Sequence, residues 1–273
     1  MPIEIISTIF EFYTAEIRGN LHTTPLTLGA VCQSWRQIAW STPSIWTSFA
    51  FLLKQPENPT RVEVAVEWLQ RSRRLPVSIE LYTSADLGPQ TPVDALLPLI
   101  ESINLCSDRW RSLSLSVPPL ILSHINDNYG APPVMDSLYI NVADSKFIHL
   151  SIPSTMSKKV DITGISLEDL SFQWDNTTYV SADGSYTVYD CIEILRQGTH
   201  LIKCYFVPMD SGFHDVTFDM CMNHQVTYLN FLCYCEEQDM AFFFDHVTLP
   251  ALHTLHLNMM MDGVPVQSLT TFI

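Results

Sequence analysis

The chain has 273 residues, of which 47% are apolar and 16% charged, and this composition argues against wholesale disorder. Its 29 Asp and Glu residues outnumber its 14 Lys and Arg residues. An acidic surface repels nucleic acid, so the balance disfavours a general DNA- or RNA-binding protein. No Lys or Arg follows Lys203, whereas eight carboxylates do. We expect any partner bound there to be basic, with a simple solvated acidic surface as the alternative.

Cysteine usage and the N-terminus bear on the compartment. The seven cysteines are an odd number in a chain large enough to fold without disulfides, which is typical of reduced, buried thiols. The first residues carry Glu4 and no basic flank, unlike a signal peptide. No apolar run approaches the length of a membrane span. We therefore expect an intracellular protein, cytoplasmic or nuclear, without a membrane partner.

Residues 1–53 have the pattern of short helices. Apolar side chains repeat with helical spacing over residues 5–13 and again from Leu28 to Ala39, where they form one stripe on a predicted continuous helix. The Ser-Thr-Pro sequence at 41–43 should break that helix, and Trp46 lies just beyond the break. A helix of this kind is also what an ordinary core would contain.

Residues 54–273 open with a linker rich in Pro and Asn, followed by a helix that Thr60 and Glu63 should cap. Short runs with period-two alternation then predict strands. These runs are residues 76–82, 110–117, 136–142, 158–164, 167–174, 200–207, 226–234 and 251–259. A second helix is predicted from Asp190, as N-cap with Glu193, to a stop at Gly198.

The spacing of these runs predicts a repeat architecture. They recur at roughly 25–35 residues, and Leu252, Leu255 and Leu257 match a Leu-x-x-Leu-x-Leu core. Strands separated by helices or loops indicate a parallel sheet that coils as a solenoid. A doubly wound α/β domain is the rival, although no glycine-rich phosphate loop follows any strand.

The N-terminal region contains a recurrent pattern made by Pro2, Glu4, Ile5, Ile6, Ile9, Phe10, Val31, Cys32, Trp35, Arg36, Ile38, Ala39, Thr42, Pro43 and Trp46. In this pattern the region resembles the F-box, and more narrowly the F-box of mushroom-type fungal proteins, with Met1 where Leu is usual. The rest resembles the leucine-rich-repeat-type region of the same family. Members usually have a helical stretch before the F-box and further repeats after the last one, so a truncated chain is expected.

The resemblance implies an α+β protein with a small all-helical F-box at residues 1–53. An irregular leucine-rich-repeat-like α/β solenoid at 54–273 would then recognise the substrate. It implies docking on the Skp adaptor, and through it on a cullin scaffold, in a ubiquitin ligase. The residues expected at or near the adaptor are Pro2, Ile5, Ile6, Ile9, Leu28, Val31, Cys32, Trp35 and Ile38. Trp46 is expected to pack back and join the two regions.

The expected substrate is a protein, and two long polar segments could present a recognition surface for it, at residues 174–190 and 208–219. Both mix aromatic and acidic side chains, namely Tyr179, Asp183, Asp210, Phe213, His214 and Asp215. Exposed loops also accumulate such residues without any binding role.

No catalytic motif is found: the chain has no Gly-x-Ser-x-Gly, His-Glu-x-x-His or phosphate-binding Gly-Lys loop. Cys233 and Cys235 lack the second ligand pair of a zinc site. We therefore predict a protein that is not an enzyme and that needs neither metal nor cofactor. The alternative to a ligase receptor is a repeat-type interaction module that works outside any ligase.

Overall fold

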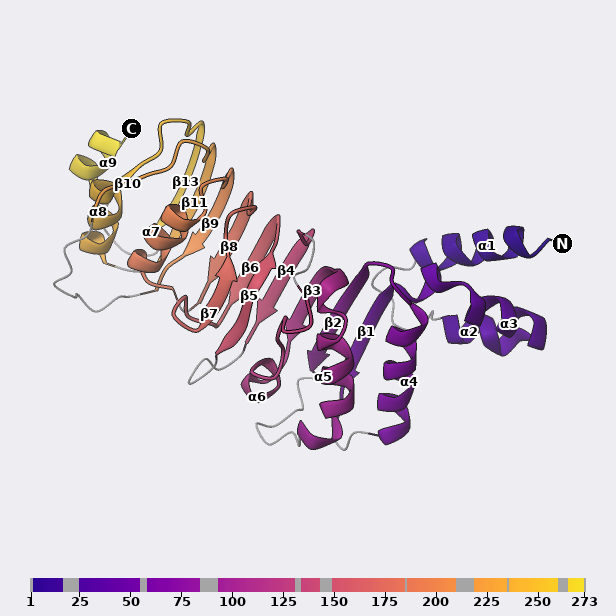
Figure 1. Ribbon diagram of the computed structural model, residues 1–273. Helices are drawn as coiled ribbons and strands as arrows, with labels where there is room; N and C mark the ends of the chain where they lie inside the picture. Colours follow the sequence, from indigo (N-terminus) through magenta and orange to yellow (C-terminus); the bar gives the residue numbers. More distant parts are fainter. Residues whose placement is uncertain are drawn as a thin grey trace.

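The computed structural model describes residues 2–16, 25–54, 58–83, 93–130, 134–142, 149–184, 186–209, 219–234, 236–259 and 265–272. It is an elongated molecule, with a helical N-terminal part at one end and a long sheet leading away from it (Figure 1). The two parts have separate apolar cores: a small one built on Phe10 and Trp46, and a large one that follows the sheet.

The N-terminal part consists of three α-helices and a 3₁₀ turn: α1 (Ile3–Glu16), α2 (Pro25–Val31), α3 (Gln33–Ser41) and η1 (Pro43–Trp46). The expectation of one continuous helix through Cys32 is wrong. The backbone of Cys32 is extended, and its sulfur accepts a hydrogen bond from the backbone N–H of Trp35, so it caps α3. The predicted break at residues 41–43 is confirmed, since α3 ends at Ser41.

A nine-stranded parallel sheet forms the rest of the scaffold, and its strands follow one another in chain order. They are β1 (Ser48–Leu53), β2 (Val77–Thr83), β3 (Trp110–Ser116), β4 (Ser137–Asn141), β6 (Lys159–Thr163), β8 (Tyr179–Asp183), β9 (Lys203–Val207), β11 (Tyr228–Cys233) and β13 (Thr254–Met259). The mixed helix-and-sheet class and the parallel sheet are thereby confirmed. A doubly wound sheet would reverse its strand order at a switch point, and this order runs in one direction.

Helices and short strands connect the main strands. The helical segments are α4 (Pro59–Arg71), η2 (Val93–Ala95), α5 (Leu97–Asn104), η3 (Ser107–Arg109), α6 (Pro119–Leu122), α7 (Val188–Gln197), α8 (Glu237–His246) and α9 (Val266–Phe272). Two small parallel sheets pair β5 (Leu150–Met156) with β7 (Leu170–Gln173) and β10 (Cys221–Met222) with β12 (Val247–Thr248).

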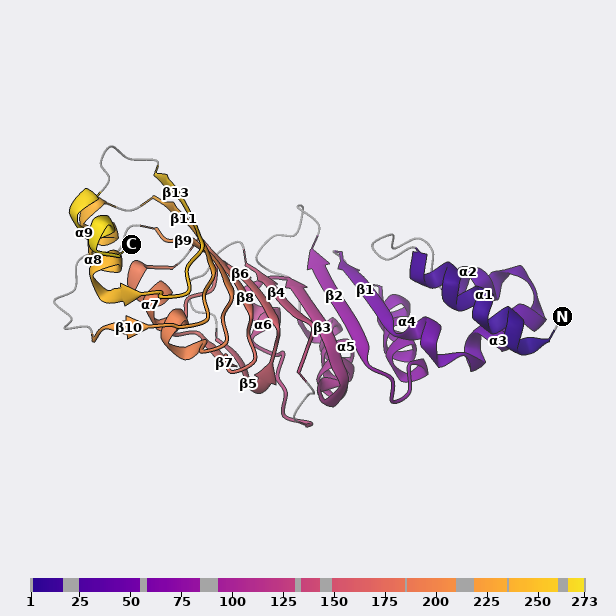
Figure 2. The same cartoon turned by 90° about the horizontal axis from the view of Figure 1, so that it is seen from above.

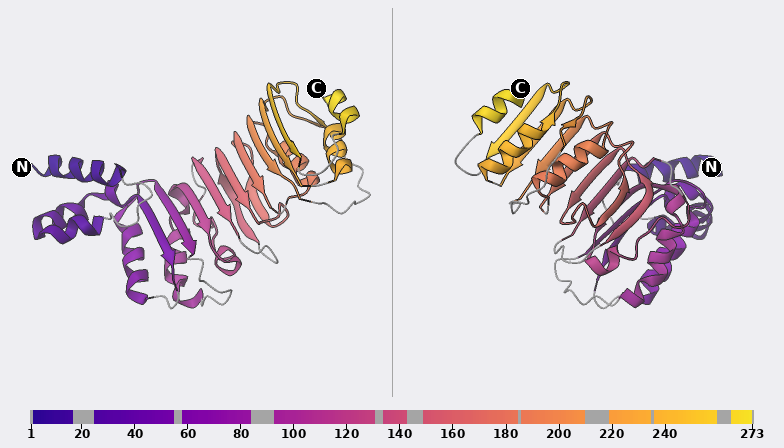
Figure 3. Two further views of the ribbon diagram at one scale, coloured as in Figure 1. Left: turned by 180° about the vertical axis from the view of Figure 1, so that it is seen from behind. Right: turned by 60° about the vertical axis from the view of Figure 1, so that its left-hand side comes forward.

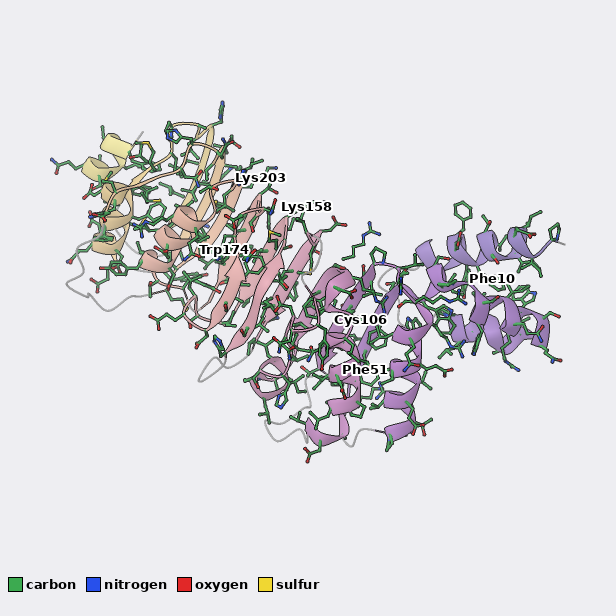
Figure 4. The ribbon with its side chains drawn as sticks, viewed as in Figure 1. Phe10, Phe51, Cys106, Lys158, Trp174 and Lys203 are labelled. Atoms are coloured by element: carbon green, nitrogen blue, oxygen red, sulfur yellow. The ribbon has the colours of Figure 1, made fainter. Side chains whose placement is uncertain are left out.

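The main sheet is covered on one face and open on the other. Alternate strand residues are buried with helix residues in the large core, while those between them are half-buried or exposed. Helices α4, α5 and α7 lie on the same side of the strands in Figures 1 and 2. In Figure 4, Phe51 and Cys106 lie among these helices and strands. Seen from behind, the strands present a face without helices (Figure 3, left).

All eight predicted strands are present, although β7 belongs to a small sheet. Strands β1, β5 and β8 and the two-residue strands β10 and β12 were not predicted. Residues 48–53, predicted to belong with the N-terminal helices, form β1, the first strand of the main sheet. Two helix caps also differ from prediction. Asn58 rather than Thr60 caps α4, and Thr187 with Asp190 forms the capping box of α7. The predicted stop at Gly198 is confirmed.

Candidate functional site

The first surface that stands out is an apolar stripe on α1. Ile5, Ile9 and Phe12 lie four and three residues apart, a spacing that places them on one helix face. Their exposed fractions are 50%, 48% and 70%. We call these three residues the α1 stripe. Contiguous exposed apolar side chains of this size are typical of interaction surfaces, because a partner that covers them removes apolar surface from water.

The opposite face of α1 packs on α2 and α3. Phe10 is buried, and its ring meets the edge of the Trp35 ring with centroids 5.1 Å apart. Leu28 and Ile38 are buried in the same cluster. These two residues hold the helices together from the inside. That they lie at or near an adaptor interface stays a prediction.

The remaining residues expected at the adaptor lie on or near the surface. Pro2, Val31 and Cys32 are exposed with Ile5 and Ile9, whereas Ile6 and Trp35 are half-buried. Sequence reasoning missed two neighbours, Ile3 and Phe12, which are among the most exposed apolar side chains of this part. They stand outside the family pattern, so only the helical spacing of Phe12 after Ile5 and Ile9 could have indicated it.

A tryptophan cluster attaches the helical part to the sheet. The indole N–H of Trp46 donates to the carbonyl of Ala39 at 2.8 Å, and that of Trp68 on α4 donates to the carbonyl of Trp46 at 3.0 Å. The Trp46 ring lies 5.1 Å from that of Trp68 and 5.3 Å from that of Trp40, edge to face. The Arg71 guanidinium lies over Trp40 and Trp46. The expectation that Trp46 joins the two parts is confirmed.

A second surface lies on the open face of the main sheet, where aromatic rings follow one another across four strands. Centroid distances are 5.3 Å from Tyr179 to Tyr205, 5.2 Å from Tyr205 to Tyr228, and 5.4 Å from Tyr228 to His256. We call these four residues the tyrosine ladder. They come from β8, β9, β11 and β13. Tyr179 and Tyr228 are both in register with Lys203, whereas Tyr205 and His256 are both in register with Asn230, so the rings alternate between two neighbouring rows of the sheet.

The strands before the ladder present a different surface. Ser48, Ser78, Ser112 and Ser137 are in register on β1 to β4, so that half of the open face begins with small hydroxyls. The ladder half instead offers large planar side chains with hydroxyl groups, which suit the recognition of another molecule better than a row of serines does.

A carboxylate adjoins the ladder. Asp161 on β6 is in register with Ser181 on β8, which is in register with Tyr205. Burial raises the pKa of Asp161 above its ordinary value; a hydrogen bond with Ser181 lowers it, and the charge of Asp183 raises it. Burial and the charge of Asp161 also raise the pKa of Tyr179. Asp161 is thus a partly buried carboxyl group that interacts electrostatically with Asp183 and Tyr179.

The predicted substrate-contacting residues are only partly accounted for. Tyr179 begins β8 and belongs to the ladder, and Asp183 ends the same strand and is exposed. Both therefore lie on a strand of the main sheet. Asp210, Phe213, His214 and Asp215 lie outside the described residues.

Sequence reasoning missed Asp161, Tyr205, Tyr228 and His256 as members of one surface. Tyr205, Tyr228 and His256 lie in predicted strands with their alternation visible, but the register that stacks the rings depends on connection lengths between the strands. His253 and His256 are exposed, as predicted.

Comparison with known proteins gives no further assignment. No family model matches the chain, and no curated protein matches it. Among the described residues, no group of three His, Cys, Asp or Glu side chains could hold a metal ion. Within the same residues, no helix has both the length and the apolar character needed to cross a membrane.

Proposed function

We propose that this chain is the substrate-recognition subunit of a Skp–cullin–F-box ubiquitin ligase. In this proposal the N-terminal helices dock on the Skp adaptor, and the leucine-rich-repeat-like sheet region binds a protein substrate in the cytoplasm or nucleus. The observation that carries the proposal is the α1 stripe, together with the F-box-like sequence in which it lies. The chain itself performs no chemical step.

The energetic case for docking rests on how much apolar surface the helices leave in water. Burying a side chain such as Ile or Phe is worth roughly 1.5–3 kcal/mol, and the three side chains of the α1 stripe are about half or more exposed. Val31 on α2 is 61% exposed. A partner that covers these residues gains a substantial part of that energy, less the cost of association.

The two parts are suited to a scaffold. Because the tryptophan cluster joins the helices to the sheet through buried hydrogen bonds and ring contacts, a substrate on the sheet would be held at a defined position relative to the adaptor. Tethering raises the effective concentration of a substrate near the ubiquitin-charged enzyme, which is how a receptor without catalytic residues promotes a reaction.

The test is co-expression with a fungal Skp adaptor, followed by affinity capture of the adaptor and size exclusion. Ile5→Asp with Ile9→Asp places two charges in the α1 stripe and should abolish co-purification. Gln37→Asp changes an exposed polar position on α3 and should leave it intact. Trp35→Ala is less informative, because Trp35 packs on Phe10 and its truncation also loosens the helices.

The outcomes separate the ligase receptor from the alternative. A complex with the adaptor that also retains a cullin supports the receptor. A well-folded chain that stays apart from the adaptor contradicts it and favours an interaction module outside any ligase. Equal co-purification of the stripe variant and the Gln37→Asp control would show that docking does not use α1.

A further inference from the structure

The half of the open face that carries the tyrosine ladder, from β6 to β13, combines the aromatic rings of the ladder with the carboxylates of Asp161 and Asp183. The first row across the strands reads Lys159, Tyr179, Lys203, Tyr228, and the second reads Asp161, Ser181, Tyr205, Asn230, His256. Aromatic faces carry negative potential and attract cations, most strongly where a carboxylate completes the site. This combination therefore favours a cationic partner.

Among the described residues, neither lysine of the first row forms an ion pair with Asp161. Both are exposed at the start of their strands, and Lys203 lies with Lys158 at the same end of the sheet in Figure 4. Within the described part of the chain, no lysine or arginine is among the groups that shift the pKa of Asp161. Asp161 thus has no ion-pair partner within the part of the chain that the structure describes.

The net charge of the chain also favours a basic partner. The chain carries a net charge of −15, and its sequence beyond Lys203 has eight carboxylates and no Lys or Arg. The ladder lies on β8 to β13, and two of its strands belong to that anionic stretch. A basic partner would be drawn to this end of the sheet and an acidic one repelled.

We propose that the ladder half of the open face binds an extended, arginine-containing segment of a protein partner, with one guanidinium against the Tyr179 and Tyr205 rings and its charge on Asp161 and Asp183. Arginine fits better than lysine, because its planar fork stacks on aromatic rings and bonds two carboxylate oxygens at once. The ladder crosses three strand spacings of about 4.8 Å. That width accommodates about four residues of extended chain.

This inference rests on the proposed function in one respect: the arginine-containing segment would belong to the substrate of the ligase. Binding itself belongs to the sheet, and the α1 stripe takes no part in it. The two claims can therefore fail separately, provided that adaptor co-purification is measured on the same preparations.

The test is fluorescence anisotropy with a labelled octapeptide of four Gly-Arg repeats and the full chain. Asp161→Asn with Asp183→Asn should weaken binding at least about tenfold, the range of one charge-assisted hydrogen bond. Tyr205→Leu should weaken it roughly two- to fivefold through loss of the cation–π contact. The matched control is Glu63→Gln with Glu101→Gln, which removes two exposed charges from α4 and α5 and should change affinity less than about twofold.

Three results would overturn the proposal: no binding of the peptide to the native chain, an equal loss in the site pair and the control pair, or tighter binding of a peptide of four Gly-Glu repeats. An equal loss would show that the peptide responds to net charge alone. Circular dichroism of each variant establishes that it is folded, and unchanged adaptor co-purification by the site pair shows that the two surfaces act independently.

Discussion

Replacing Trp46 tests whether the tryptophan cluster holds the helical part in place. The side chain is 1% exposed, donates to the Ala39 carbonyl and packs against two other tryptophans. Removing a buried aromatic side chain costs about 3–5 kcal/mol, and the Ala39 carbonyl would lose its partner. We expect Trp46→Ala to ease the opening of α1 to α3 by at least about 3 kcal/mol, or roughly 100-fold in the opening equilibrium.

The assay is limited proteolysis with trypsin, read by mass spectrometry at Arg36. This residue is exposed within α3, and a helix must open locally before it can be cleaved, so the rate reports the opening equilibrium when reclosing is fast. Trp46→Phe is the control, because it keeps a ring and loses the N–H; we expect an increase of roughly tenfold. If Trp46→Ala leaves the cleavage rate at Arg36 unchanged, the cluster does not secure the helices.

Three further predictions concern the sheet and the surface thiol. Burial raises the pKa of Asp161 in the folded chain above its value in the unfolded chain, so ionisation of Asp161 at higher pH destabilises the fold. Asp161→Asn should therefore raise the urea midpoint of unfolding at pH 7. The difference in midpoint between variant and native chain should disappear as the pH falls below the ordinary carboxyl range. Gly164 has φ +74°, and an added Cβ would overlap the carbonyl oxygen of Val142. Gly164→Ala should therefore lower the free energy of unfolding by more than about 2 kcal/mol. Gly184→Ala should lower it by about 1 kcal/mol, because φ is +92° there but the nearest atoms lie 3.8 Å from the added Cβ. Cys32 is the exposed one among the described free cysteines, so iodoacetamide should modify it before Cys106, Cys191, Cys204 and Cys221, and bound adaptor should slow that reaction.

The main strands could be predicted because one face of each is buried. Leu113 and Leu115 alternate with serines in β3, and the same pattern recurs along the chain. The alternation of apolar and polar residues is missing in β1, because residues 49–53 are all apolar. A run of this kind shows no period of two. The pattern fails again at β8, where the core-facing residues are Val180 and Ala182, so a single larger apolar side chain marks the alternation.

Helix ends were harder to predict than helices. The spacing from Leu28 to Ala39 suits a single helix, yet the chain turns at Cys32, because α2 and α3 both pack on α1 around Phe10. In α7, two overlapping capping-box patterns are present in the sequence, and the structure uses the one that begins at Thr187. Tertiary packing decides between such local alternatives.

Of the two candidate surfaces, the α1 stripe was largely predictable and the tyrosine ladder was not. Ile5 and Ile9 follow from helical spacing and from the family pattern. Tyr205 and Tyr228 are 23 residues apart, and their rings meet only because the intervening chain returns with the register that pairs Tyr228 with Lys203. That register is set by the path of the segments that connect the strands, and no local sequence pattern encodes it.

The most direct test of the account is hydrogen exchange of the chain with and without a fungal Skp adaptor. The account predicts slower exchange in α1 and α2 when the adaptor is present, with β9, β11 and β13 unchanged. Protection confined to the sheet, or none in α1 at saturating adaptor, would contradict it.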